Sequence, residues 1–195
     1  RYGFITTLDL YLLDAICAFL ASCQEKGEPV VPISLNLSRI DLSNRNIVKH
    51  ITNTVEKYRI DHRLIQLEVT ETAYIDNPGQ MCQVVKELQG LGFTILMDDF
   101  GTGYSSMNML YSLPLDILKI DRTFIQALGE GTRSRYIIAS LIDLGKNLSF
   151  PVIAEGVETE EQLNCLKDLG CNLVQGYLYS KPVVQAEFRQ LLRKG

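Results

Sequence analysis

The chain alternates short apolar runs with longer amphipathic stretches along most of its length. Apolar runs of four to eight residues are typical of buried strands, whereas apolar residues at i, i+3 and i+4 are typical of helices. The runs predict strands at about residues 31–37, 64–70, 93–98, 116–120, 151–155 and 173–178. The amphipathic stretches predict helices near residues 8–26, 45–59, 78–91, 105–112, 133–149, 159–169 and 184–193. This alternation predicts a parallel sheet covered by helices.

Polar residues inside the predicted strands follow a second pattern. Since successive strand residues face opposite sides, Gln66, Glu68 and Thr70 share one face of the second strand, opposite its apolar residues. Each of the six predicted strands carries such a polar residue near its carboxyl end. A doubly wound sheet buries both faces under helices and has little use for this series, whereas a barrel gathers its strand ends into one mouth. We therefore predict an α/β fold, a TIM-like barrel, as a single domain over residues 1–195.

The number of strands is lower than a complete barrel requires. A TIM barrel has eight strands in about 250 residues, and six are predicted in this chain of 195 residues. The sequence opens directly in a predicted helix, so we expect the first two strands of the barrel to be the ones that this chain lacks. Because a barrel without two strands exposes two sheet edges, an N-terminally incomplete domain is favoured over a finished one.

Composition and charge narrow the function classes. The 46% hydrophobic and 22% charged residues fit ordinary globular material. A net charge of -4 argues against DNA binding, because duplex binding needs a basic surface. We found no apolar run of the eighteen or so residues that span a bilayer, and the opening stretch carries acidic residues unlike a signal peptide. The sequence thus predicts a cytoplasmic domain without a membrane segment, whose five cysteines, lacking any CxxC pair, are free thiols.

Acidic residues gather at the predicted mouth. The strand ends supply Asn36, Glu68, Asp98, Lys119, Glu155 and Gln175, with Glu71, Asp99, Asp121 and Glu158 beside them. Seven carboxylates around one lysine repel one another unless cations neutralise them, so the cluster predicts bound divalent metal. Oxygen ligands without sulfur or imidazole suit Mg²⁺ or Mn²⁺. Two such ions would favour attack of water on a phosphodiester.

Individual residues at the mouth allow more than one interpretation. Glu155 ends an apolar strand, and a partly desolvated carboxylate is a candidate general base. Lys119 could orient a water molecule or offset the charge that develops on a phosphate. Alternatively, it is an ordinary ion-pair partner. Asp98 and Asp99 can reach one site only if the strand ends there; otherwise they are two solvated acids at a turn.

Six motifs in order resemble those of the EAL domain family. They are Asn36-Leu37-Ser38, Glu68-Val69-Thr70-Glu71, Asp98-Asp99-Phe100-Gly101-Thr102-Gly103-Tyr104-Ser105-Ser106, Leu118-Lys119-Ile120-Asp121, Ala154-Glu155-Gly156-Val157-Glu158-Thr159 and Gln175-Gly176-Tyr177. The resemblance covers nearly the whole chain. It implies a TIM-like barrel with one antiparallel strand, and metal-dependent hydrolysis of cyclic di-GMP to linear pGpG in bacterial second-messenger signalling.

The resemblance also implies a role for each residue of the mouth. The family's metal ligands fall on Asn36, Glu68, Asp98 and Asp99. Its lysine near the attacking water falls on Lys119, and its general base falls on Glu155. Its loop-bracing glutamate falls on Glu71, and its supporting residues fall on Asp121, Glu158 and Gln175. In the family the braced loop, residues 100–106 here, links dimerisation to metal binding. A homodimer and an attached sensory or GGDEF domain are therefore expected partners.

One family feature is absent, and it keeps alternatives open. The Glu-Ala-Leu motif, whose glutamate is a metal ligand in the family, would precede the first helix. Its absence favours an inactive EAL-like receptor for cyclic di-GMP or a protein-interaction module, whereas the intact hydrolytic residues favour an enzyme. A Schiff-base aldolase using Lys119, or an enolase-like enzyme, is a third class that the residues alone permit.

Overall fold

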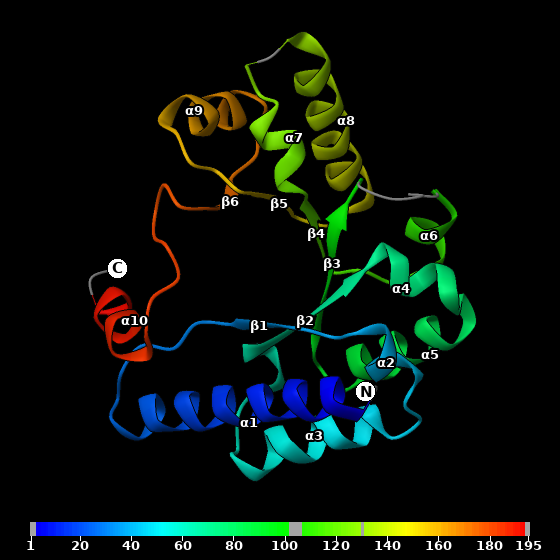
Figure 1. Cartoon of the computed structure of the whole chain (residues 1–195), viewed down its shortest axis with the longest axis vertical. Helices are drawn as coiled ribbons and strands as arrows, with labels where there is room; N and C mark the ends of the chain where they lie inside the picture. The colour runs from blue at the N-terminus through cyan, green and yellow to red at the C-terminus, as the bar shows by residue number, and fades with distance from the viewer. Residues whose placement is uncertain (1–2, 102–106, 130, 194–195) are drawn as a thin grey trace.

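The computed structural model describes residues 3–101, 107–129 and 131–193, which fold around a curved parallel sheet (Figure 1). Its strands are β1 (Ile33–Asn36), β2 (Ile65–Thr70), β3 (Thr94–Phe100), β4 (Ile117–Ile120), β5 (Val152–Glu155) and β6 (Leu173–Gln175). They lie in the order β1-β2-β3-β4-β5-β6, and every neighbouring pair is parallel. All six predicted strands are therefore confirmed, although β6 ends three residues earlier than predicted.

Helices surround the outside of this sheet (Figure 1). The longer ones are α1 (Gly3–Glu25), α3 (Ile47–Lys57), α5 (Pro78–Gly90), α8 (Thr132–Leu148), α9 (Glu160–Asp168) and α10 (Gln185–Leu192). Shorter ones are α2 (Arg39–Ser43), α4 (Glu71–Asp76), α6 (Met107–Ser112), α7 (Arg122–Gln126) and the 3₁₀ helix η1 (His62–Leu64). The first two residues of the helix predicted at 105–112 lie outside the described residues. The sequence prediction missed α2, α4, α7 and η1.

The sheet curls into part of a barrel. Within the described residues β1 and β6 each pair on one side only, so the sheet is open between them (Figure 1). This curled six-stranded sheet confirms the predicted class of a TIM-like barrel with fewer than eight strands.

The pleat sorts apolar from polar side chains as predicted. On the face that the helices cover, Leu67, Ile95 and Leu118 are fully buried. Their strand neighbours Glu68 and Lys119 point to the inner face, at the carboxyl ends of the strands. Hydrophobic burial against the helices thus fixes which residues enter the mouth, because a one-residue slip would exchange the two faces.

Helix α1 is long and apolar enough to cross a membrane by length and composition alone, over Ile5–Glu25, although no apolar run of that length was found in the sequence analysis. Its residues Leu13, Cys17 and Leu20 are buried in the core, where α1 packs against α3 and β1. A core helix of a globular domain passes the same test, so the finding is weak support for a membrane segment.

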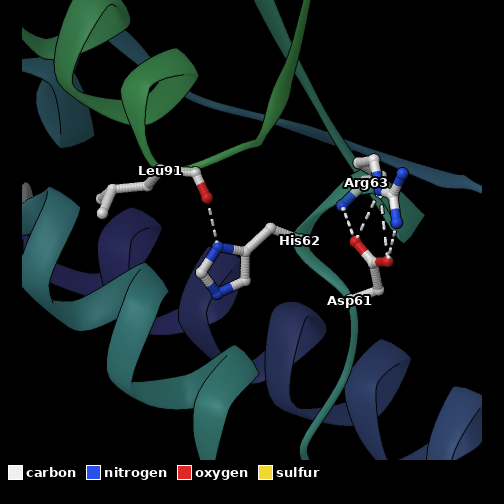
Figure 2. A network of polar contacts seen from close by, with 4 residues as sticks. All are labelled: Asp61, His62, Arg63 and Leu91. Atoms are coloured by element: carbon white, nitrogen blue, oxygen red, sulfur yellow. Dashed lines mark hydrogen bonds and ion pairs between the residues drawn. The ribbon is translucent and has the colours of Figure 1, made fainter.

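The connection before β2 carries His62 at the amino end of the strand, at the opposite end from the mouth. His62, just before β2, has Nδ1 2.5 Å from the Leu91 carbonyl oxygen and stacks on Phe93 (Figure 2). We assign the proton to Nδ1 because a carbonyl only accepts. Asp61 accepts hydrogen bonds from the backbone and guanidinium of Arg63 and begins η1 (Figure 2). These contacts join β2 to the end of α5 and serve the fold.

Gly176→Ala should destabilise the fold by about 1–3 kcal/mol or more, as overpacking does. A β-carbon at Gly176 would lie 2.1 Å from the Val157 carbonyl oxygen and 2.3 Å from its nitrogen, and backbone has little room to move. Gly90→Ala is the control, because its β-carbon meets no atom within 4 Å and alanine suits a helix. Thermal unfolding measures both; equal melting temperatures would contradict the assigned contact.

Candidate active site

The carboxyl ends of β1 to β6 bring the predicted residues to one edge of the sheet. Asn36 pairs in register with Glu68, Thr70 with Asp98, and Glu155 with Gln175. Between β3 and β4 the register shifts from Met97 to Phe100, which marks an irregularity at the two aspartates.

This irregularity lets two adjacent aspartates serve one site. In a regular strand Asp98 and Asp99 would face opposite sides. The backbone of Asp99 is left-handed instead, with φ of 54°. An oxygen of Asp98, one of Asp99 and one of Glu155 lie within 4.8 Å of one another. The prediction that the strand ends at Asp98 is wrong, because β3 continues to Phe100, and the left-handed backbone of Asp99 brings the two aspartates to one site instead.

Lys119 lies at the centre of the mouth. Its side chain is 4% exposed, and its ammonium donates a 2.8 Å hydrogen bond to Glu68 Oε1. Nζ also forms ion pairs with Asp98 Oδ1, at 2.9 Å, and with Glu155 Oε1. One cation thus faces three carboxylates from β2, β3 and β5.

Two of these carboxylate oxygens are buried and depend on the lysine. Asp98 Oδ1 and Glu155 Oε1 have no other hydrogen-bond partner among the described residues, and the ammonium of Lys119 lies against both. Removing one partner from buried charges leaves the others uncompensated. Lys119 is therefore the cation that neutralises the side chains at this edge of the sheet.

The charges of the mouth are strongly coupled. Burial raises the pKa of the Glu155 carboxyl; Lys119 opposes this, while Asp98 and Glu68 add to it. Burial also raises the pKa of Asp99, and the neighbouring charges of Asp98 and Asp121 raise it further. For Lys119, burial by itself would lower the pKa, but Glu155 and Glu68 outweigh it and raise the pKa above its ordinary value. Lys119 is therefore a permanent cation at neutral pH.

The donor set fits a divalent metal. Asp98, Asp99 and Glu155 each offer a carboxylate oxygen, and these oxygens lie within 4.8 Å of one another. Hard oxygen ligands suit Mg²⁺, Mn²⁺ or Ca²⁺. Of the four predicted ligands, Asp98 and Asp99 belong to this group of three; Glu68 binds Lys119, and Asn36 lies exposed at the end of β1. Glu155, predicted as a base, is the third member.

Glu71 braces the segment that follows the two aspartates. Its side chain is 3% exposed, and Oε1 accepts a 2.8 Å hydrogen bond from the Gly101 amide. Gly101 has φ of 100°, and a β-carbon there would lie 2.6 Å from the ring of Phe124. The predicted bracing contact thus exists at the first part of the loop, while residues 102–106 lie outside the described residues.

Glu71→Ala should weaken metal binding by about tenfold, the lower end of the effect of removing an outer-shell partner. It leaves the Gly101 amide without its acceptor, which loosens the backbone next to Asp99. Glu71→Gln keeps an acceptor oxygen and should retain near-normal affinity. Calorimetric titration with Mn²⁺ measures both variants; equal affinities of the alanine and glutamine variants would contradict the bracing role.

The three remaining predicted residues lie at the rim. Asp121 caps α7 by accepting hydrogen bonds from the backbone and hydroxyl of Thr123. Glu158 and Gln175 are exposed side chains, and the Gln175 carbonyl accepts from the Val157 amide. The sequence reasoning missed Thr123, although an aspartate two residues before a threonine at a strand end is a recognisable helix start.

The chain is similar in sequence to proteins that act on cyclic di-GMP. The EAL domain model matches residues 1–182. Cyclic di-GMP phosphodiesterase NbdA of Pseudomonas aeruginosa is 37% identical over 191 residues, which cover 98% of this chain and 24% of NbdA. The chain therefore spans about a quarter of that relative.

Solved structures share the fold. PaMucR phosphodiesterase in complex with c-di-GMP is 33% identical, with a TM-score of 0.89 over 95% of this chain and 75% of that one. Klebsiella pneumoniae BlrP1, in a manganese and cyclic di-GMP complex, is 29% identical, with a TM-score of 0.83 over 95% of this chain and 46% of that one.

Proposed function

The chain belongs to the EAL domain family, and we propose that it forms the catalytic barrel of a metal-dependent phosphodiesterase that hydrolyses cyclic di-GMP to linear pGpG. The observation that carries the proposal is the convergence of Asp98, Asp99 and Glu155 beside the buried Lys119. A receptor needs to hold its ligand, but it has no use for a buried lysine among acids at a metal-binding edge.

We assign the cation site to Asp98 and Asp99, with Glu68 and Asn36 on the neighbouring strands as the family's further ligands and Glu155 beside them as the base. One or two bound Mg²⁺ or Mn²⁺ ions would neutralise charge on the scissile phosphate and lower the pKa of an attacking water. Carboxylates on the adjacent strands β2 and β3 can hold such ions, because the sheet fixes their spacing.

The residues of the chain have complementary tasks in this proposal. Glu155, whose pKa burial raises, accepts the proton of the attacking water. Lys119, held charged by its acidic neighbours, offsets negative charge that develops on the phosphate. Since Lys119 contacts the carboxylate of Glu155, it also fixes the direction in which that base points.

The test is to incubate the protein with cyclic di-GMP and Mg²⁺ or Mn²⁺ and to separate the nucleotides by chromatography. We expect pGpG with either ion, none with a chelator, and none from Asp98→Ala, which removes a carboxylate of the metal group. Asp76→Ala, an exposed ion-pair residue of α4, is the control and should keep activity. Tight nucleotide binding without product would favour the receptor alternative, and hydrolysis by Asp98→Ala would contradict the metal assignment.

The wider context of the chain is also a proposal. The relative MucR is named a bifunctional diguanylate cyclase and cyclic di-GMP phosphodiesterase, and the relative DosP is named an oxygen sensor protein. The chain covers 27% of MucR and 23% of DosP. We infer that this barrel works as one domain, in a cytoplasmic homodimer, beside a sensory or GGDEF domain. Size-exclusion chromatography with light scattering on the full-length protein measures the dimer.

A further inference from the structure

The short helix α7 follows directly from β4, the strand that carries Lys119, and packs against β5 (Figure 1). Asp121 begins this helix by accepting a 2.9 Å hydrogen bond from the Thr123 amide. Since β4 lies between β3 and β5 in the sheet, a helix at its end can contact the turns that follow both neighbours. One of these turns comes after the two aspartates, and the other comes after Glu155.

Phe124 of α7 lies against the turn after the aspartates. A β-carbon at Gly101, two residues after Asp99, would lie 2.6 Å from Cε2 and 2.8 Å from Cζ of the Phe124 ring. The edge of the ring therefore fills the space that a side chain at Gly101 would take. Gly101 has φ of 100°, which glycine adopts readily, and its amide donates to Glu71. The turn is thus held by a hydrogen bond at its amide and by an aromatic ring at its α-carbon.

The first residue of α7 makes a similar close contact with the turn after Glu155. A β-carbon at Gly156, the next residue, would lie 2.5 Å from Arg122 Cβ and 3.3 Å from Arg122 Cα. These atoms belong to the helix backbone or adjoin it, so they cannot swing aside as the end of a long side chain can. One short helix therefore touches the backbone beside a proposed metal ligand and the backbone beside the proposed base.

Other contacts hold α7 in place. Ile125 is fully buried, and its carbonyl accepts a 3.3 Å hydrogen bond from Gln162 Nε2 on α9. Phe124 is half-buried and packs against the hydrophobic core. Because a close-packed interior has few voids and transmits strain, a displacement of either turn must displace the ring or the helix.

We propose that Phe124 is a positioning residue of the metal site, and that α7 sets the spacing between the aspartates and Glu155. The ring keeps the turn at Gly101, and with it the left-handed backbone of Asp99, in the conformation that brings both aspartates to one edge. This role rests on the proposed function, because it supports the proposed metal ligands. A change of Phe124 should therefore act on metal binding, even though Phe124 offers no ligand atom.

Calorimetric titration of the full-length protein with Mn²⁺, well below the melting temperature of every variant, tests this role. Phe124→Ala should weaken Mn²⁺ binding about tenfold, the lower end of the effect of removing an outer-shell partner. Phe124→Leu keeps much of the apolar volume against Gly101 and should restore most of the affinity. The matched control is Ile51→Ala, which removes a buried side chain from α3, a helix that packs against α1 and α5. It should lower the melting temperature but keep the wild-type Mn²⁺ affinity.

Thermal unfolding with a chelator tests the contact between the ring and Gly101 without any metal. Gly101→Ala should lower the melting temperature of the wild type by more than that of Phe124→Ala, because removing the ring makes room for the new methyl group. Backbone strain at the left-handed position is common to both backgrounds and cancels in this double-mutant cycle. Gly129→Ala is the control. Gly129 has φ of 106°, and its β-carbon would meet no atom of the described residues within 4 Å, so its effect should be equal in both backgrounds.

Each contrary result has a distinct meaning. Equal Mn²⁺ affinities of the wild type and Phe124→Ala would overturn the positioning role, and so would an equal loss of affinity in Ile51→Ala. Equal effects of Gly101→Ala in the two backgrounds would overturn the contact on which this role depends. A wild-type protein that neither binds Mn²⁺ nor forms pGpG would overturn the proposed function, and the positioning role with it, whereas the contact is judged by unfolding alone.

Discussion

Glu155→Gln should reduce the hydrolysis of cyclic di-GMP by about 10²–10⁴-fold, the range that a positioned general base contributes. Glutamine keeps the size of the side chain and an oxygen toward the mouth, but it cannot take a proton from water. Binding of the nucleotide should stay within a few-fold of wild type, because Lys119 and the aspartates remain. The measurement is the maximal rate of pGpG formation, beside nucleotide affinity by calorimetry.

The control for this variant is Glu160→Gln in the first turn of α9, where the carboxylate is exposed. It makes the same chemical change outside the mouth and should leave the rate unchanged. A Glu155→Gln protein that turns over normally would remove Glu155 from the role of base. Loss of both rate and nucleotide binding would identify it as mainly a ligand of the metal group.

Lys119→Met should destabilise the metal-free protein by about 3–5 kcal/mol, the cost of removing one partner from a buried charge cluster. Methionine fills similar space, but it leaves Glu68, Asp98 and Glu155 facing one another without a cation. Their side chains are between 9% and 17% exposed, so water screens them poorly. In the proposed site, divalent metal would bind the same carboxylates and should restore part of the loss.

Thermal unfolding with chelator and with Mn²⁺ measures this effect. We expect Mn²⁺ to raise the melting temperature of Lys119→Met by more than it raises that of wild type. Lys57→Met is the control, because its ion pair with Asp14 is exposed and contributes little. An equal response of wild type and Lys119→Met to Mn²⁺ would show that the lysine and the metal do not share these carboxylates.

The sequence predicted the strands and the mouth because both follow from local patterns. Apolar runs identified β1 to β6, and the pleat alone assigned Glu68 and Lys119 to the inner face. The short helices were missed because elements of three to six residues show no helical period. Two helix caps could have revealed them. The pair Ser38 and Asp41 caps α2, and the pair Asp121 and Thr123 caps α7.

The contacts between side chains within the mouth could not be predicted from local sequence patterns. Lys119 meets Glu68 and Glu155 only because four strands align in a particular register, and that register depends on packing across the whole sheet. The end of β6 was overestimated for a similar reason: Gly176 lies against the backbone of Val157, a contact that no sequence pattern marks.

The left-handed backbone of Asp99 has a consequence for how far this protein can be stabilised. With φ of 54° it adopts a conformation that glycine reaches without penalty and that costs other residues about 1–2 kcal/mol, although aspartate tolerates it better than most. Selection for a robust fold alone would place glycine there. The aspartate thus marks a trade-off, in which part of the fold's thermal tolerance is given up for a second carboxylate at the proposed metal-binding edge.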